Sequence, residues 1–125
     1  MKIFSIAFAG LISITALTAC ATATDDIKTV AAINQNNATL VGKTISAQGK
    51  VVKVNNGIMG RNFVHVQDGT GDAKTNTNNL IITSKQTAQV GDQVTISGVV
   101  VLNRDFGSGY MYPLLIEDAT IAPKK

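Results

Sequence analysis

The residues best suited to metal chemistry gather in one stretch, Val54–Gly71, whose sequence is VNNGIMGRNFVHVQDGTG. This stretch contains the only histidine of the chain, His65, and one of its three methionines, Met59. Thioether sulfur selects Cu(I), and imidazole also binds copper. With Met111 added, the chain offers two thioethers and one imidazole, enough for a three-coordinate Cu(I) site. In the alternative interpretation, Met59 packs on the end of the domain, Met111 fills the core and His65 is a solvated surface residue.

Aromatic and basic side chains in the same region indicate a binding surface. Aromatic rings can stack on planar groups, and neighbouring cations can pair with phosphates or carboxylates. We expect the partner to be a protein, a glycan or a small ligand, with an oligonucleotide as a lesser alternative. The predicted ligand-binding residues are Phe63, His65, Arg61, Lys53, Tyr110 and Tyr112.

Catalysis is not predicted. Acid–base catalysis needs titratable groups held together with shifted pKa values, and the chain has one histidine and one cysteine. Neither an HExxH nor a GxSxG pattern occurs. The adjacent acids Glu117 and Asp118 would point to opposite faces of a strand. We therefore expect a binding protein that is not an enzyme and needs no cofactor unless it carries Cu(I).

The first twenty residues predict export. Lys2 precedes the apolar run Ile3–Leu17, which is too short for a comfortable transmembrane span and is typical of a secretory signal. The run ends in Leu-Thr-Ala-Cys20, which resembles a bacterial lipoprotein signal. Acylation of Cys20, the only cysteine, would anchor the protein to a membrane and leave no thiol or disulfide. The alternative is an ordinary signal peptide with a cysteine there by chance.

This interpretation divides the chain into three parts: residues 1–19 as the signal peptide, 20–26 as the lipidated cysteine and a tether, and 27–125 as one folded domain. No aspartate follows Cys20 directly. By resemblance to Gram-negative lipoproteins, this predicts the outer membrane, with the domain facing the periplasm. The net charge of +3 is weak and spread along the chain. It does not favour a strong nucleic-acid binder.

Two glycine-containing segments predict the fold. VGKTISAQGKVVKV and VGDQVTISGVVVLN both start with Val-Gly, and each has a second glycine seven residues later, Gly49 and Gly98. A glycine inside a strand marks a bend, and bent strands let a small barrel close. The chain has no tryptophan, so the core must rest on Val, Ile and Leu. The predicted strands are Val41–Val54, Asn62–Asp68, Asn79–Thr83, Val90–Asn103 and Tyr110–Ile116, with Ala119–Ile121 as an extension.

The resulting prediction is an all-β domain, a five-stranded OB-fold Greek-key barrel, with a small β-sandwich as the alternative. A short N-terminal helix should precede it, capped by Asp25 or Asp26 and ended by the Asn-rich segment 34–37. The segment Ser84–Gln89 has room for about one further helical turn.

Three segments carry a family resemblance: GKVVKVNNGIMGRNFVHVQDGTG, VGDQVTISGVV and RDFGSGYMYPLLIEDATI. They resemble the small exported OB-fold proteins of bacteria, which are often labelled nucleic-acid-binding from the fold alone. Some of these are similar to accessory proteins encoded beside periplasmic nitrite-reductase systems. The resemblance covers Val41–Ile121. Exported copper-carrying OB-folds use methionines, a histidine and a nearby tryptophan, and this chain has Phe63 where those have the tryptophan.

An OB-fold implies where the binding surface lies. Ligands of this fold commonly meet the outer face of strands two and three and the loops beside it. Alternation along the second strand directs Val64 and Val66 to the core, and Phe63 and His65 outward. The glycine-rich loop Arg104–Pro113 would lie beside the loop that carries Met59. These residues would then form one binding face.

Overall fold

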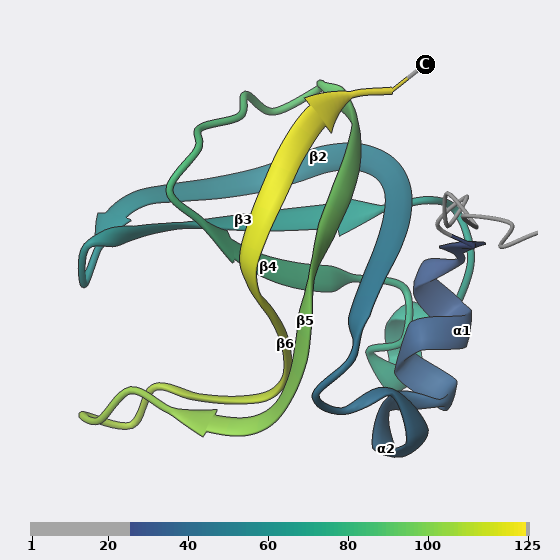
Figure 1. The fold of residues 1–125 in the computed structure, drawn as a ribbon, viewed down its shortest axis with the longest axis horizontal. Helices are drawn as coiled ribbons and strands as arrows, with labels where there is room; N and C mark the ends of the chain where they lie inside the picture. The colour runs from purple at the N-terminus through teal and green to yellow at the C-terminus, as the bar shows by residue number, and fades with distance from the viewer. Residues whose placement is uncertain (1–25, 125) are drawn as a thin grey trace, which may run out of the picture.

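The structure is a computed structural model that describes residues 26–124 (Figure 1). The predicted signal peptide and Cys20 lie outside the described residues. No helix in the described part is long and apolar enough to cross a membrane. The elements in chain order are β1 (Ile27–Lys28), α1 (Val30–Gln35), α2 (Asn37–Leu40), β2 (Thr44–Ile58), β3 (Arg61–Gln67), the short 3-10 helix η1 (Ala73–Thr75), β4 (Leu80–Ser84), β5 (Gln93–Asp105) and β6 (Met111–Pro123).

The chain forms one mixed sheet, which confirms the all-β class. The strand order is β1-β2-β3-β4-β6-β5, and β2 pairs with β5 as well. Starting from β2, the strands pair in the order β3, β4, β6 and β5, and β5 pairs with β2 again. The pairings of these five strands therefore form a closed circuit. The sheet has six strands and not the predicted five, because Ile27 and Lys28 pair in parallel with Ser46 and Ala47. A two-residue strand is too short to leave an alternating pattern in the sequence.

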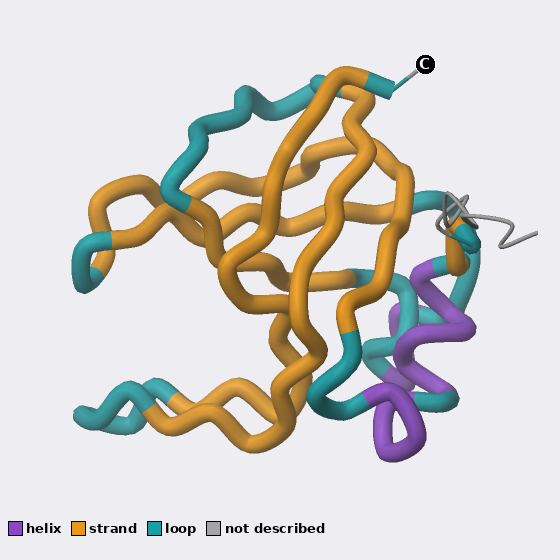
Figure 2. The backbone as a smooth tube through the Cα atoms, viewed as in Figure 1, coloured by secondary structure: helices purple, strands orange, loops and turns teal. Residues whose placement is uncertain are grey.

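The core lies inside this sheet and is made of aliphatic side chains. Val64 and Val66 are fully buried, as predicted from alternation along β3. Cross-strand pairs such as Ala47 with Ile96 and Val64 with Ile82 bring the inward side chains together. The helices lie together on one side of the strands (Figure 2), and the buried residues of α1, Val30 and Ile33, join the same core.

Gly49 and Gly98 mark two places where neighbouring strands approach closely. They lie in the β2–β5 contact, opposite Val94 and Ile45 respectively. A Cβ atom on Gly49 would lie 2.6 Å from the carbonyl oxygen of Gln67, and one on Gly98 would lie 2.8 Å from that of Glu117. Both glycines are needed because no side chain fits between these backbones.

A β-bulge in β6 faces Gly98. Ser97 pairs with Thr120 and Val99 with Glu117, so Asp118 and Ala119 together oppose the single residue Gly98. Asp118 has a φ of 51°, in the left-handed region. A bulge increases the local twist and bends its strand. The bulge therefore helps to bend β6, which starts in a projecting hairpin and ends beside β5 at the opposite side of the sheet.

The start of helix α1 differs from the prediction. The N-cap is Thr29, whose hydroxyl oxygen accepts from the amide of Ala32, and not Asp25 or Asp26. A second cap comes from far along the chain, because the carboxylate of Asp68 accepts from the amide of Val30 at 2.9 Å. Sequence proximity could not reveal a cap that acts over 38 residues.

The segment after β4 also differs from the prediction, because it forms no helical turn. Its first residues are held to the sheet by the Ser84 hydroxyl, which accepts from the amide of Gln86 and donates to the carbonyl oxygen of Ala119. The side chain of Gln86 then accepts from the amide of Ile121. These bonds fix the segment in an irregular path along β6.

Candidate functional site

Two hairpins project toward the same side of the molecule (Figure 1). The β2–β3 hairpin turns at Met59 and Gly60, which have φ angles of 52° and 76°. Two consecutive residues with positive φ are typical of the tight turns that join antiparallel strands. The β5–β6 hairpin turns through Gly107–Gly109, all with positive φ, and is closed by a bond from the amide of Phe106 to the carbonyl oxygen of Tyr110. The glycine-rich loops thus end two projecting ribbons.

An aromatic cluster joins the two hairpins. The ring of Phe63 lies 5.6 Å from that of Phe106 and 5.4 Å from that of Tyr112, measured between centroids, and the latter two rings lie 5.8 Å apart. Two of the three pairs have the edge-to-face geometry that aromatic rings favour. The cluster therefore holds the β5–β6 hairpin against the outer face of β3.

Two arginines and one acid complete this cluster. The guanidinium carbons of Arg61 and Arg104 lie 5.2 and 4.9 Å from the centre of the Phe106 ring. Both arginines also contact one carboxylate oxygen of Glu117, at 3.5 and 3.2 Å. We call these residues the aromatic–arginine cluster: Arg61, Phe63, Arg104, Phe106, Tyr112 and Glu117.

The prediction that Phe63 is exposed on the outer face is wrong. Phe63 does lie on the opposite face of β3 from Val64, as alternation requires, but only 2% of its surface is exposed. Phe106 and Tyr112 cover it, and Tyr112 is itself partly buried. The face expected to meet a ligand is occupied by the protein's own hairpin.

Four of the eight large apolar side chains that are exposed in the described residues lie at the ends of the hairpins, and the other four are Ile27, Val41, Val52 and Val90. Between 41% and 58% of the surface of each of the four hairpin residues is accessible. Large apolar side chains gathered on projecting loops are candidates for contact with a partner. We call these four residues the tip surface: Ile58 and Met59 on one hairpin, Tyr110 and Met111 on the other.

The structure divides the six predicted ligand-binding residues among three places. Phe63, Tyr112 and Arg61 belong to the aromatic–arginine cluster, and Tyr110 lies beside it in the tip surface. Lys53 and His65 lie in the middle of β2 and β3, where they are cross-strand neighbours. Sequence reasoning missed Phe106, Arg104 and Glu117 as members of the cluster. Their only sequence signal was the aromatic and charged flanks of the glycine-rich loop.

The three residues of the predicted Cu(I) site do not converge. Met59 is at the β2–β3 turn, and His65 lies four residues beyond Arg61 along β3, a rise of about 13 Å. Met111 starts β6, opposite Asp105 in the other hairpin. The predicted alternative that Met111 fills the core is wrong too, because 58% of its surface is exposed. The described residues include no group of three or more His, Cys, Asp or Glu side chains placed to hold a metal ion.

His65 interacts with Asn79. The Asn79 amide nitrogen lies 3.0 Å from Nδ1 of the half-buried imidazole. Burial lowers the pKa of His65, and the positive charge of Lys53 lowers it further. The neutral ring then accepts from the Asn79 amide at Nδ1 and carries its proton on Nε2. The Asn79 side-chain oxygen is buried with no hydrogen-bond partner in the described region, which costs about 1–3 kcal/mol of stability.

We expect the free energy of unfolding to decrease as the pH falls below 6.5, the ordinary pKa of histidine. The unfolded state binds the proton more readily than the folded state, so protonation favours unfolding until the pH lies below the lowered pKa of folded His65. Urea unfolding between about pH 7.5 and pH 5 measures this change. The His65→Gln variant should lose this part of the pH dependence of stability. Identical pH profiles for the variant and the unmodified protein would contradict the assignment of this dependence to His65.

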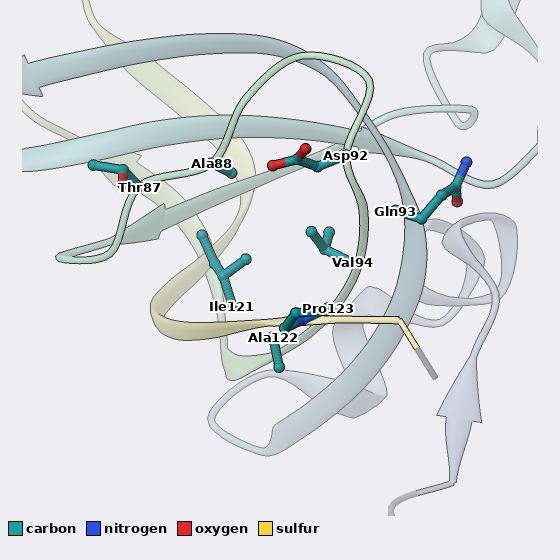
Figure 3. A pocket seen from close by; sticks show the side chains of 8 residues that line it. All are labelled: Thr87, Ala88, Asp92, Gln93, Val94, Ile121, Ala122 and Pro123. Atoms are coloured by element: carbon teal, nitrogen blue, oxygen red, sulfur yellow. The ribbon is translucent and has the colours of Figure 1, made fainter.

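The cavities that open on the surface of the described region include three of about 270 to 570 Å³. The cavity in Figure 3 has a volume of about 270 Å³ and lies between the irregular segment before β5 and the end of β6. Its only titratable lining residue, Asp92, accepts from the amide of Gln89 and so stabilises a turn. A second cavity, of about 320 Å³, includes Lys50 and Lys124 in its lining. The third is the largest, at about 570 Å³, and opens beside α1 and η1.

Comparison of the sequence with protein-family models and with curated proteins finds no match. The geometry of the two hairpins and the cavities is therefore the basis for a functional interpretation.

Proposed function

We propose that this protein is an exported, lipid-anchored OB-fold module that binds a partner protein through its tip surface. Strands β2 to β6 would form the five-stranded barrel, with β1 and the two helices added at its N-terminal side. The observation that carries the proposal is the set of exposed apolar side chains, Ile58, Met59, Tyr110 and Met111, on two hairpins joined by a packed cluster. Exposed apolar side chains on preorganised loops lose little conformational entropy when they bind.

The position of the tip surface suits an anchored protein. The described chain starts near one end of the longest axis of the molecule, and both hairpins point toward the other end (Figure 1). Six residues separate Cys20 from Ile27, so the Cα atoms of these two residues lie at most about 25 Å apart. With its lipid in the outer membrane, the protein would hold the domain close to the bilayer and direct the tip surface into the periplasm.

A protein partner is favoured over an oligonucleotide. Single-stranded nucleic acids bind by stacking their bases on exposed aromatic rings along a basic groove. Phe63 is buried and Tyr112 packs against it, which leaves Tyr110 as the most exposed ring of those expected to stack. The arginines of the cluster are already paired with Glu117.

Site-specific photo-crosslinking in living cells tests the proposal. A photoreactive amino acid is placed at Tyr110 of the full chain, and a matched position, exposed Ala38 on α2, serves as the control. We expect a discrete crosslinked protein from position 110 and none from position 38. Adding Met59→Asp and Met111→Asp to the Tyr110 probe should abolish the product, because charged residues cannot be buried against an apolar partner without a large desolvation cost. Equal crosslinking from both positions, or from neither, would contradict the proposal.

A further inference from the structure

We infer that the largest of these three cavities is a binding site for a neutral saccharide. None of the four tip-surface residues lines it. Its volume of about 570 Å³ lies within the range of small-molecule sites. The polar part of its lining is made of carboxamide and hydroxyl groups, and no charged side chain lines it. These polar residues are Asn34, Asn37, Asn76, Asn79, Thr75 and Thr77.

The rest of the lining is apolar. Ile81 of β4 and Pro113 and Leu114 of β6 form this part, where the starts of the two strands diverge. β4 and β6 share only the register pair Ile82 with Ile116, so the two strand starts leave room for the cavity. A sugar ring matches such a site, because its hydroxyl groups both donate and accept while its C–H face is apolar.

The polar wall is held in place before a ligand arrives. The amide nitrogen of Asn34 donates to the carbonyl oxygens of Val30, Thr77 and Asn79, at 2.9, 3.2 and 3.4 Å. These bonds tie the segment before β4 to helix α1. The Asn34 side-chain oxygen accepts no hydrogen bond within residues 26–124, which leaves an oriented acceptor for a ligand hydroxyl.

The segment that carries the remaining polar residues is closed by its own hydrogen bonds. The amide of Thr77 donates to the carbonyl oxygen of Asp72 at 3.0 Å, and the hydroxyls of Thr75 and Thr77 lie 3.0 Å apart. Asn76 adopts a φ of 57°, in the left-handed region. A preorganised wall of this kind lowers the entropic cost of binding.

Asn79 adds a group that a ligand would satisfy. Its amide nitrogen is used by His65, whereas its oxygen is buried without a partner. Asn79 lines the cavity, so we expect a ligand hydroxyl to donate to this oxygen. The Asn79 oxygen would then lack a hydrogen-bond partner in the free protein and gain one in the complex with the saccharide.

The same lining disfavours other ligand classes. A phosphate or carboxylate would find no cation in it, and a nucleobase would find no aromatic ring to stack on. Extended peptides commonly bind by adding a strand to an open sheet edge. The β6 segment that lines the cavity contains Pro113, which has no N–H to donate to such a strand.

NMR titration of the purified chain with defined probes tests this inference. The probes are diacetylchitobiose and maltose as neutral saccharides, inorganic phosphate as an anion, and an acetylated alanine dipeptide amide as a peptide. We expect at least one saccharide, and neither other probe, to shift the amide resonances of residues 75–81. The Asn37→Ala variant removes a carboxamide that makes no hydrogen bond in the described structure, and should weaken binding by about 3- to 10-fold.

The matched control is Asn56→Ala, which removes an exposed carboxamide of the β2–β3 hairpin and should leave the saccharide affinity unchanged. Equal weakening by both variants would overturn the inference, as would absence of saccharide shifts up to the solubility limit. Shifts of the same resonances by the dipeptide or by phosphate would replace the saccharide with that class. Asn37 lies on α2 and belongs to neither hairpin, so the result of this titration is read independently of the crosslinking experiment at Tyr110.

Discussion

Replacing Phe63 by alanine is expected to lower the free energy of unfolding by about 3–4 kcal/mol, the usual cost of deleting a buried phenylalanine. For a domain of this size, such a loss lowers the melting temperature by roughly 15 °C. The physical reason is the contact of the Phe63 ring with both Phe106 and Tyr112, from which solvent is almost fully excluded. Urea unfolding of the purified chain, followed by circular dichroism, measures the change.

Two variants make this experiment specific. Phe63→Leu keeps most of the apolar volume and should cost less than about 1.5 kcal/mol. Tyr110→Ala removes an aromatic ring of the covering β5–β6 hairpin that is 58% exposed and should change stability by less than about 0.5 kcal/mol. If Phe63→Ala were as mild as Tyr110→Ala, the β5–β6 hairpin would not cover β3. The cluster also positions the tip surface, so Phe63→Ala should weaken the crosslink from position 110 in cells.

Replacing either strand glycine by alanine is expected to destabilise the domain by about 2–3 kcal/mol. The added Cβ of Gly98→Ala would lie 2.7 Å from the Ile116 side chain and 2.8 Å from the Glu117 carbonyl oxygen. That of Gly49→Ala would lie 2.6 Å from both the Val66 side chain and the Gln67 carbonyl oxygen. A backbone oxygen cannot move aside as a flexible side chain does, so β2 or β5 must shift instead.

The control for this steric effect is Gly57→Ala in the β2–β3 hairpin. An added Cβ there meets nothing within 4 Å, and its cost comes only from the positive φ of 71°. That cost is about 1 kcal/mol. Thermal unfolding of the three variants should therefore separate the close approach of strands from backbone strain. Equal losses at Gly57 and Gly98 would contradict the steric explanation.

The long strands could be predicted because their signals are local. Alternation placed Val64 and Val66 in the core, and the paired glycines Gly49 and Gly98 marked the contact between β2 and β5. Each of these patterns depends on the backbone geometry of one strand and its immediate neighbours. They are visible in a window of about ten residues.

The burial of Phe63 could not be predicted in the same way. Alternation gives the face on which a side chain lies, but burial depends on what covers that face. Here the cover consists of Phe106 and Tyr112, 43 and 49 residues further along the chain. The prediction of the N-cap of α1 failed for a similar reason, because part of the capping comes from Asp68, which is distant in the sequence. Contacts of this kind, between residues far apart in the sequence, determine which side chains of the site are buried. No short sequence window contains both partners of such a contact.

The pairing of β2 with β5 has a consequence for how the chain reaches its folded state. Thr44 pairs with Val99, so β2 and β5 must meet across more than half of the domain sequence. Contacts of such long sequence separation make folding slow, because the entropy of closing the loop is lost before the contacts form. Until residues 93–99 are available, β2 exposes an open strand edge that can pair with another chain. A chain that crosses a membrane before it folds would therefore need protection of β2 until its last third has emerged.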